Sequence, residues 1–304
     1  MQLFNFVSRA AAVTAVLAAL VAPSAGAAQS SPPATPAVAV GPQYDSSHVY
    51  VAKEQFDRFI ASFAATFGGT LSKKVIVDIT PTASQTLSQI ALTPAGTISV
   101  FGFETPIPYP FGDELYGYLV SDMDVAVLAA RADGAAIVVA PYDDPIGRDA
   151  IIEWPGGVYM QLYWHTVTPH YAELGNAPEN RVYESPDTAD AFVRDFIAFS
   201  HGTVSSDDRK APSSEIGIPS GVFRRIRIAS PFGTMTVIVT DGHLPYPYGR
   251  ETAGYLVSDL AETLIKAKAA GAVVLVAPYP AAGGEAAIVQ FPGGYIAEIH
   301  SSAK

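Results

Sequence analysis

Two pairs of polar residues have the types and the spacing of a binding or catalytic site. His48 and Tyr50 lie two apart in the strand-like run HVYVA, and Glu298 and His300 lie two apart in AEIHS. Side chains two apart in a strand point to the same face of a sheet. Imidazole and carboxylate groups are common general acids and bases, so Glu298 and His300 are candidate catalytic residues as well as candidate ligand-binding residues.

A third strand-like run adds an amide and two phenols. In VYMQLY the side chains of Tyr159, Gln161 and Tyr163 alternate onto one face. If this face meets that of His48 and Tyr50, the five residues line a cavity suited to a carbonyl or phenolic ligand. The alternative interpretation is a histidine hydrogen-bonded to a glutamine inside a core, with no ligand.

Several other titratable residues are predicted to be solvated. Asp143, Asp144 and Asp149 crowd the segment DDPIGRD, which we interpret as an exposed turn because a calcium loop needs a longer and more regular array of oxygen ligands. His165 is expected to lie in an exposed loop.

The elements that would position these residues occur in a repeated order. The hexapeptide GYLVSD stands at 117–122 and again at 254–259, and the similarity extends without a gap over 108–157 and 245–294. A tandem duplication therefore gives two units at 44–168 and 181–304, joined by a linker at 169–180. Each unit contains two runs of strand, amphipathic helix and three strands, so the sequence predicts βαβββ four times.

This arrangement resembles the glyoxalase/bleomycin-resistance/extradiol-dioxygenase group, the vicinal oxygen chelate (VOC) superfamily. The resemblance covers both units and rests on His48 with a following FGG, on V-S-D-x-D before the second helix, and on P-G-G-x-x-x-[QE]-[LI] near the end of each unit. It implies an α+β fold in which paired βαβββ modules form open barrels, two VOC-like domains in tandem. Because this scaffold hosts lyases, isomerases, dioxygenases and metal-free binding proteins, the fold does not fix an activity.

The resemblance also implies four positions per unit for the ligands of a divalent metal. Carried onto this sequence, they are His48, Val100, Leu115 and Gln161 in the first unit, and Arg181, Val237, Thr252 and Glu298 in the second. Neither set has the usual three ligands, because valine and leucine cannot ligate and an arginine repels a metal. We therefore expect no cofactor, with Zn, Ni, Fe or Mn held by His48 and Gln161 as the alternative.

Two further expectations depend on these positions. Arg181 and Glu298 are expected to form an ion pair in place of a metal, and with Thr252 and His300 they make a polar cluster that could bind a carboxylate. A single β-bulge would reverse the strand alternation and bring Tyr118 or Glu114 into the first cavity instead of Leu115.

The N-terminal residues and the composition limit the location and the partners. Arg9 precedes the short apolar run 10–22, which ends at Ala25-Gly26-Ala27, so 1–27 is predicted to be a cleavable signal peptide and 28–43 a disordered leader rich in Pro, Ala and Ser. Export to the periplasm or the medium follows. The chain has no cysteine, which excludes disulfides and thiolate chemistry. Removing Arg9 takes the formal net charge from −11 to −12, and a chain this acidic is not expected to bind nucleic acid or, after cleavage, a membrane.

The sequence therefore predicts an exported VOC-like protein that holds a small organic molecule, carbonyl-bearing or aromatic, in a barrel cavity with a depleted metal site. One alternative is a metal-dependent lyase, isomerase or dioxygenase, so whether the chain is an enzyme stays open. The other alternative is a structural or interaction module. Two units in one chain favour a monomer.

Overall fold

The computed structural model describes residues 35–281 and 283–302. The predicted signal peptide and the first residues of the leader, 28–34, lie outside the described residues. The first half of the chain contains the elements β1 (Ser46–Tyr50), α1 (Phe56–Phe67), β2 (Thr70–Leu71), β3 (Val75–Val77), β4 (Thr86–Thr93), β5 (Gly96–Phe103), β6 (Tyr116–Leu119), α2 (Met123–Ala132), β7 (Ala136–Asp143), β8 (Gly147–Trp154) and β9 (Val158–His165).

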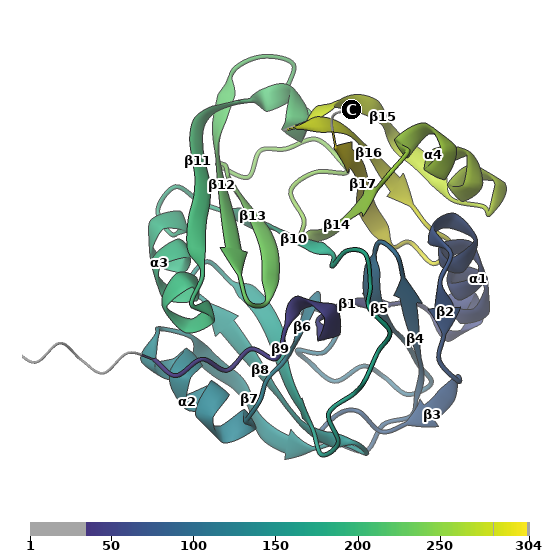
Figure 1. Ribbon diagram of the computed structural model, residues 1–304, viewed down its shortest axis with the longest axis vertical. Coiled ribbons are helices and arrows are strands. Elements are labelled where there is room, and N and C mark those ends of the chain that lie inside the picture. Colours follow the sequence, from purple (N-terminus) through teal and green to yellow (C-terminus); the bar gives the residue numbers. More distant parts are fainter. Residues whose placement is uncertain (1–34, 282, 303–304) are drawn as a thin grey trace, which may run out of the picture. The chain divides into compact units, whose positions relative to one another are not determined.

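The second half repeats this order, with one longer strand, β11, in the place of the short β2 and β3. Its elements are β10 (Glu179–Glu184), α3 (Ala189–Ser200), β11 (Thr203–Pro212), β12 (Val222–Ser230), β13 (Gly233–Val239), β14 (Thr252–Val257), α4 (Leu260–Ala269), β15 (Val273–Ala281), β16 (Gly284–Gln290) and β17 (Ile296–Ser302). The βαβββ unit predicted from the sequence is therefore present four times (Figure 1).

Each half of the chain forms one curled sheet from two modules. The first sheet has the order β2-β4-β5-β1-β6-β9-β8-β7, and the second has the order β11-β12-β13-β10-β14-β17-β16-β15. In every module the first strand pairs in parallel with the last, and the two modules of a sheet meet through the antiparallel pairs β1–β6 and β10–β14. The first and last strands of all modules therefore line the inside of two half-barrels, as the α+β prediction required.

The repeated hexapeptide forms the junction between the first strand and the helix of the second module. Asp122 and Asp259 cap α2 and α4, each accepting a hydrogen bond of 2.9 Å from the backbone N–H three residues on. Such caps satisfy N–H groups that a helix leaves without an internal partner. The predicted capping role of the Ser-Asp pair is confirmed for the aspartate.

The two sheets share their hydrophobic cores. One core joins α2 and strands β6, β8 and β9 to α3 and strands β10, β12 and β13, with Trp154 packed against Phe196 and Phe199. The other joins α1, β1 and β5 to α4 and strands β14, β16 and β17. Figure 1 shows α1 beside α4 accordingly, and the two helices are in contact. Burial behind the sheets leaves their concave faces free to form cavities.

The structure differs from the sequence prediction over 35–43, part of the segment expected to be disordered. Val38 is buried in the first core, Ala39 bridges to Val120, and Val40 donates a backbone hydrogen bond of 3.1 Å to Leu119. The Pro, Ala and Ser content predicted a flexible leader here. The apolar Val-Ala-Val sequence instead pairs with β6 and covers apolar surface.

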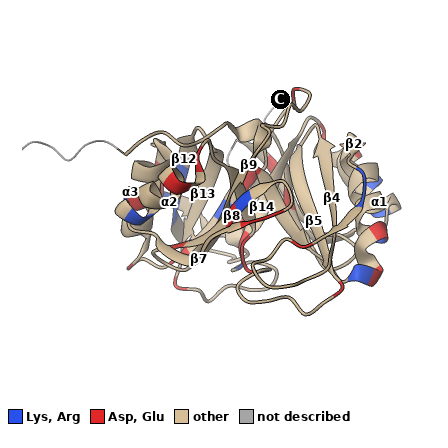
Figure 2. Cartoon of the chain, turned by 90° about the horizontal axis from the view of Figure 1, so that it is seen from below, with Lys and Arg blue, Asp and Glu red and all other residues tan. Residues whose placement is uncertain are grey.

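None of the helices in the described part of the chain is long and apolar enough to cross a membrane. Lysines and arginines are dispersed and interspersed with acidic residues (Figure 2).

Candidate functional site

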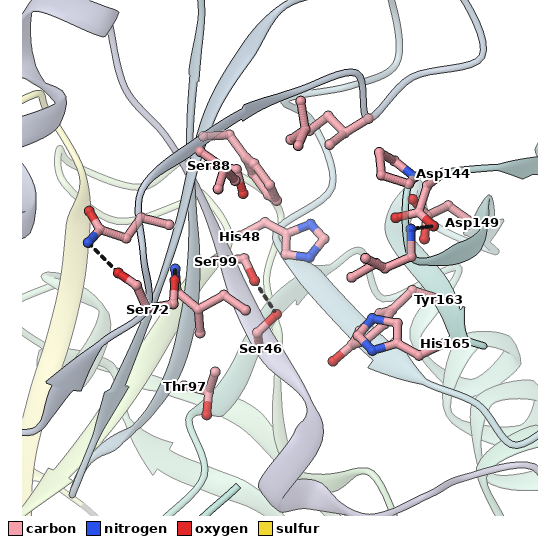
Figure 3. A pocket seen from close by; sticks show the side chains of 18 of the residues that line it. Ser46, His48, Ser72, Ser88, Thr97, Ser99, Asp144, Asp149, Tyr163 and His165 are labelled. Carbon is pink, nitrogen blue, oxygen red and sulfur yellow. Dashed lines mark hydrogen bonds between the residues drawn. The ribbon is translucent and has the colours of Figure 1, made fainter. Parts of the chain in front are cut away.

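The first half-barrel contains a cavity of about 230 Å³. Its floor is formed by β1 and β5, and its walls by β3 and β4 on one side and by β8, β9 and the β7–β8 turn on the other. Figure 3 shows Ser72 and Ser88 on the first side, His48, Ser46 and Ser99 at the centre, and Asp144, Asp149, Tyr163 and His165 on the second side. Apolar side chains complete the lining: Val75, Val77, Ile79, Ile90, Phe101, Pro145 and Ile146.

His48 lies at the centre of this cavity and is only 3% exposed. Its Nε2 atom lies 2.3 Å from the point that a Cβ on Gly117 would occupy. The glycine of the repeated hexapeptide therefore leaves room for the imidazole in this half-barrel, because any side chain there would overlap it. The Nδ1 atom of His48 has no hydrogen-bond partner among the described residues.

Glu114 lies behind His48 and is completely buried. Its Oε1 atom is 3.7 Å from His48 Nδ1 and accepts a hydrogen bond from the Tyr50 hydroxyl, while its Oε2 accepts one of 3.0 Å from Gly112 N–H. Burial and the charge of Glu114 raise the pKa of Tyr50 well above its usual value. Glu114 therefore lies beside His48 but does not enter the cavity as the bulge hypothesis expected, and Tyr118 is buried in a hydrophobic core. Tyr50 contacts Glu114 and does not line the cavity.

Two positions inferred from the family resemblance face away from the cavity. Val100 is buried in one shared core and Leu115 packs against the other. Ser99 and Phe101 of β5 line the cavity in place of Val100, because successive side chains of a strand point to opposite faces and an error of one residue exchanges cavity for core. Gly117, two residues after Leu115, is the residue of β6 that faces the imidazole of His48.

Of the three residues of β9 that were predicted to line the cavity, two do so and one does not. Gln161 and Tyr163 line the cavity. Tyr159 does not, because it lies at the turn end of the strand, where its hydroxyl is 2.9 Å from that of the exposed Tyr109. This hydrogen bond raises the pKa of Tyr159.

Three residues expected to be solvated line the cavity, namely Asp144, Asp149 and His165. Asp149 is part of β8, is 5% exposed and lines the cavity. Burial and the neighbouring Asp144 raise its pKa well above the usual value, although hydrogen bonds from Gln161 and Tyr142 oppose that shift. His165 also lines the cavity, and burial lowers its pKa. Strand β8 begins at Gly147 and pairs with β9, which ends at His165, so the segment interpreted as a turn is mostly paired.

The second half-barrel is filled by a network of charged side chains. The Arg181 Nη1 atom donates hydrogen bonds to Glu298 Oε1 at 2.8 Å and to Glu179 Oε1 at 3.0 Å. His300 Nδ1 lies 3.3 Å from the same Glu298 oxygen, and the Tyr279 hydroxyl donates to Glu298 Oε2 at 3.0 Å. The ion pair expected between Arg181 and Glu298 is present.

These contacts stabilise the charged form of Glu298 inside the protein. Burial acts to raise its pKa, but the Arg181 charge, together with hydrogen bonds from His300 and Tyr279, holds it below the usual value. The space that remains beside this network amounts to two pockets of about 30 and 10 Å³, and Thr252 lines the smaller one. The two half-barrels therefore share a fold but differ in whether a ligand has room.

No family model and no curated protein matches the sequence. The structure is similar to that of a triple mutant of 4-hydroxymandelate synthase from Streptomyces coelicolor, with a TM-score of 0.55, 14% identity and coverage of 85% of this chain and 92% of that one. It is also similar to the 2,3-dioxygenase LapB from Pseudomonas sp. KL28 (TM-score 0.51, 13% identity, 88% and 94% covered). A third similar structure is the Mn(II)-bound glyoxalase from Novosphingobium aromaticivorans (TM-score 0.51, 14% identity, 88% and 84% covered). The chain has the VOC fold.

The donor set of this chain does not fit the divalent metal that the VOC fold implies. In the first half-barrel the residue opposite His48 is Gly117, which has no side chain to bind a metal, and the His48 imidazole occupies the space next to it. In the second, the Arg181 guanidinium lies between the two carboxylates that a metal would need. Among the described residues, no group of three His, Asp or Glu side chains is arranged to hold a metal ion.

Proposed function

We propose that this protein binds a small organic molecule, carbonyl-bearing or aromatic, in the half-barrel formed by β1–β9, with one ligand per chain. The observation that carries the proposal is the cavity of about 230 Å³ in this half-barrel, against about 30 and 10 Å³ in the other. An apolar cavity of roughly 150 Å³ is large enough for benzene. The space in the first half-barrel therefore suits one aromatic ring with a short substituent.

The polar groups of the cavity support a specific ligand. Ser46 and Ser99 line the cavity, with their hydroxyls 3.2 Å apart, and the amide side chain of Gln161 lines it as well. A few polar groups in a largely apolar pocket orient a ligand, and the apolar wall would bury its ring.

The proposal is tested by filling the cavity. 4-Hydroxybenzaldehyde, which carries both a ring and a carbonyl, is the probe, and binding is followed by calorimetry and by the melting temperature. At 100 times the dissociation constant a bound ligand stabilises a protein by about 2.7 kcal/mol. Ser99→Ala, which keeps the space, is expected to retain binding, whereas Ser99→Leu, which occupies it, is expected to abolish binding. Equal binding by both variants would place the probe elsewhere and contradict the proposal.

The alternative of a metal-dependent lyase, isomerase or dioxygenase makes a different prediction. One of the similar structures is a Mn(II)-bound glyoxalase, and an enzyme of that kind would retain close to one metal ion per chain. The donor set described above favours binding without a metal. The metal content of protein purified without chelator or affinity histidines separates the two.

We also propose that the protein is exported after cleavage of residues 1–27 and acts as a monomer. Support comes from the sequence alone, namely the apolar run 10–22 and the small residues at 25–27. The mass of the protein recovered outside the cytoplasm is expected to correspond to a chain that begins at Ala28. Light scattering of that material gives the oligomeric state.

A further inference from the structure

The polar lining of the first cavity is acidic. Asp144 and Asp149 both line it. Within the described part of the chain, permanent positive charge in the lining is limited to the exposed Lys73. An anionic ligand would therefore lose its water without gaining a partner, which is costly.

Asp149 is the innermost of these acids, and its neighbours do not neutralise it. Titratable groups face it from five parts of the first half-barrel: Tyr50 of β1, Glu114 before β6, Tyr142 of β7, Asp144 of the following turn and Tyr163 of β9. All of them are acids. A carboxyl group that is buried among acids and hydroxyl groups is disfavoured as an anion, and burial raises its pKa.

Aromatic rings surround the same space. Tyr44, Phe101, Tyr163 and Tyr171 line the cavity, and the rings of Tyr44 and Tyr171 are 5.6 Å apart. The face of an aromatic ring attracts a cation, and the attraction increases when water is excluded. A buried carboxyl group and several rings around one cavity are the groups that recognise an organic cation.

We propose that the ligand of this cavity is an organic cation of about one-ring size, whose amine or ammonium group pairs with Asp149. This inference rests on the proposed function, because it requires the cavity to be a binding site. The cation supplies the positive charge that the lining lacks.

The test compares three ligands of one shape and three charges. Benzylamine, benzyl alcohol and benzoate are titrated separately into the wild-type chain at pH 7.5, with binding measured by calorimetry. We expect benzylamine to bind at least about tenfold more tightly than benzyl alcohol, since charge-assisted hydrogen bonds are roughly twice as strong as neutral ones. Benzoate is expected not to bind. Equal affinity for the amine and the alcohol, or a preference for benzoate, would overturn the inference.

Matched variants assign the preference to one carboxyl group. Asp149→Asn keeps the shape of the side chain and is expected to bring benzylamine to within about twofold of benzyl alcohol. Glu153→Gln removes the same charge from the same strand outside the cavity and is expected to retain the preference for the amine. If the preference survives Asp149→Asn, the assignment to Asp149 is wrong. If that variant does not fold, the wild-type series still decides whether the ligand is a cation.

The outcome separates this inference from the proposed function. Binding of 4-hydroxybenzaldehyde or benzyl alcohol without a preference for benzylamine leaves the cavity as a binding site and contradicts only the cationic ligand. Failure of all four compounds to bind contradicts both.

Discussion

Substitution of the glycine in the repeated hexapeptide is expected to have different effects in the two half-barrels, so the second copy serves as a control for the first. Gly117 and Gly254 occupy the same position of the repeat, and neither has a positive φ, so both backbones accept an alanine. A Cβ at 117 would lie 2.3 Å from His48 Nε2, against an ordinary contact of 3.4 Å or more. At 254 the nearest atoms, Arg181 Cδ and His300 Cε1, are both at 3.3 Å.

The expected costs follow from these distances. His48 is held on a buried strand and cannot withdraw by a full ångström, so Gly117→Ala is expected to lower the free energy of unfolding by about 1–3 kcal/mol, the usual cost of overpacking. Gly254→Ala requires a movement of only a few tenths of an ångström, and its cost is expected to stay below about 1 kcal/mol. For a chain of this size each kcal/mol shifts the melting temperature by roughly 2–4 °C.

A double-mutant cycle tests the cause. On a His48→Ala background the imidazole is gone, and Gly117→Ala is expected to cost close to nothing, measured by denaturant unfolding of all four proteins. The difference between the two backgrounds is the steric coupling of positions 48 and 117. Equal costs at 117 and 254, or a cost at 117 that persists without the imidazole, would refute the placement of His48 against the glycine.

Three further predictions concern charge. Burial and the nearby Glu184 raise the pKa of Glu251 from 4.5 to about 8. Between these pH values the folded state keeps a proton that the unfolded state releases. This residue therefore makes the free energy of unfolding fall with rising pH, by as much as about 5 kcal/mol. Unfolding measured from pH 5 to pH 9 is expected to show a smaller decline for Glu251→Gln than for the wild type, and parallel curves would contradict this. Arg181→Ala is expected to destabilise by about 3–5 kcal/mol because it leaves Glu298 buried without its cation; Glu298→Gln in the same chain should recover part of that loss, and an additive loss would argue against the pair. MnCl₂ or ZnCl₂ is expected to leave the melting temperature of the wild-type chain unchanged, whereas a rise that saturates near one ion per chain would show that the donor set was misjudged.

The fold was predictable from the sequence because every level of the pattern agreed. Strand alternation, helix caps and turn glycines all repeated in register across 108–157 and 245–294, and consistent local signals specify a fold well. The four βαβββ modules and the resemblance to the VOC fold followed from them. The sequence did not predict that the two sheets share both cores. The repeat defines the individual modules but does not show which helix-covered faces pack against each other.

The site was harder to predict because it depends on register and on loops. His48 and Gln161 were placed correctly since they stand inside regular strands, whereas Val100 was assigned to the wrong face by one residue and Leu115 precedes the strand that faces His48. Asp149 was missed because proline and glycine in DDPIGRD suggested an exposed turn. The pairing of β7 with β8 has register shifts on both sides of Val139. A simple alternation of inward and outward side chains along this hairpin therefore predicts the wrong residues for the cavity.

The two half-barrels differ at the first strand, and this difference explains why the first has room for a ligand and the second does not. Both halves place a glycine of the hexapeptide opposite the first strand, which frees space at the centre of each barrel. His48 leaves most of that space open, while Arg181 extends into it and joins Glu179 to Glu298. A guanidinium that completes a charged network cannot be displaced by a neutral ligand without exposing two buried carboxylates, and that cost opposes entry. The charge at the first strand therefore determines which half-barrel is open, and the residue that does not fit a metal in the second half also leaves the first half-barrel as the one with room for the proposed ligand.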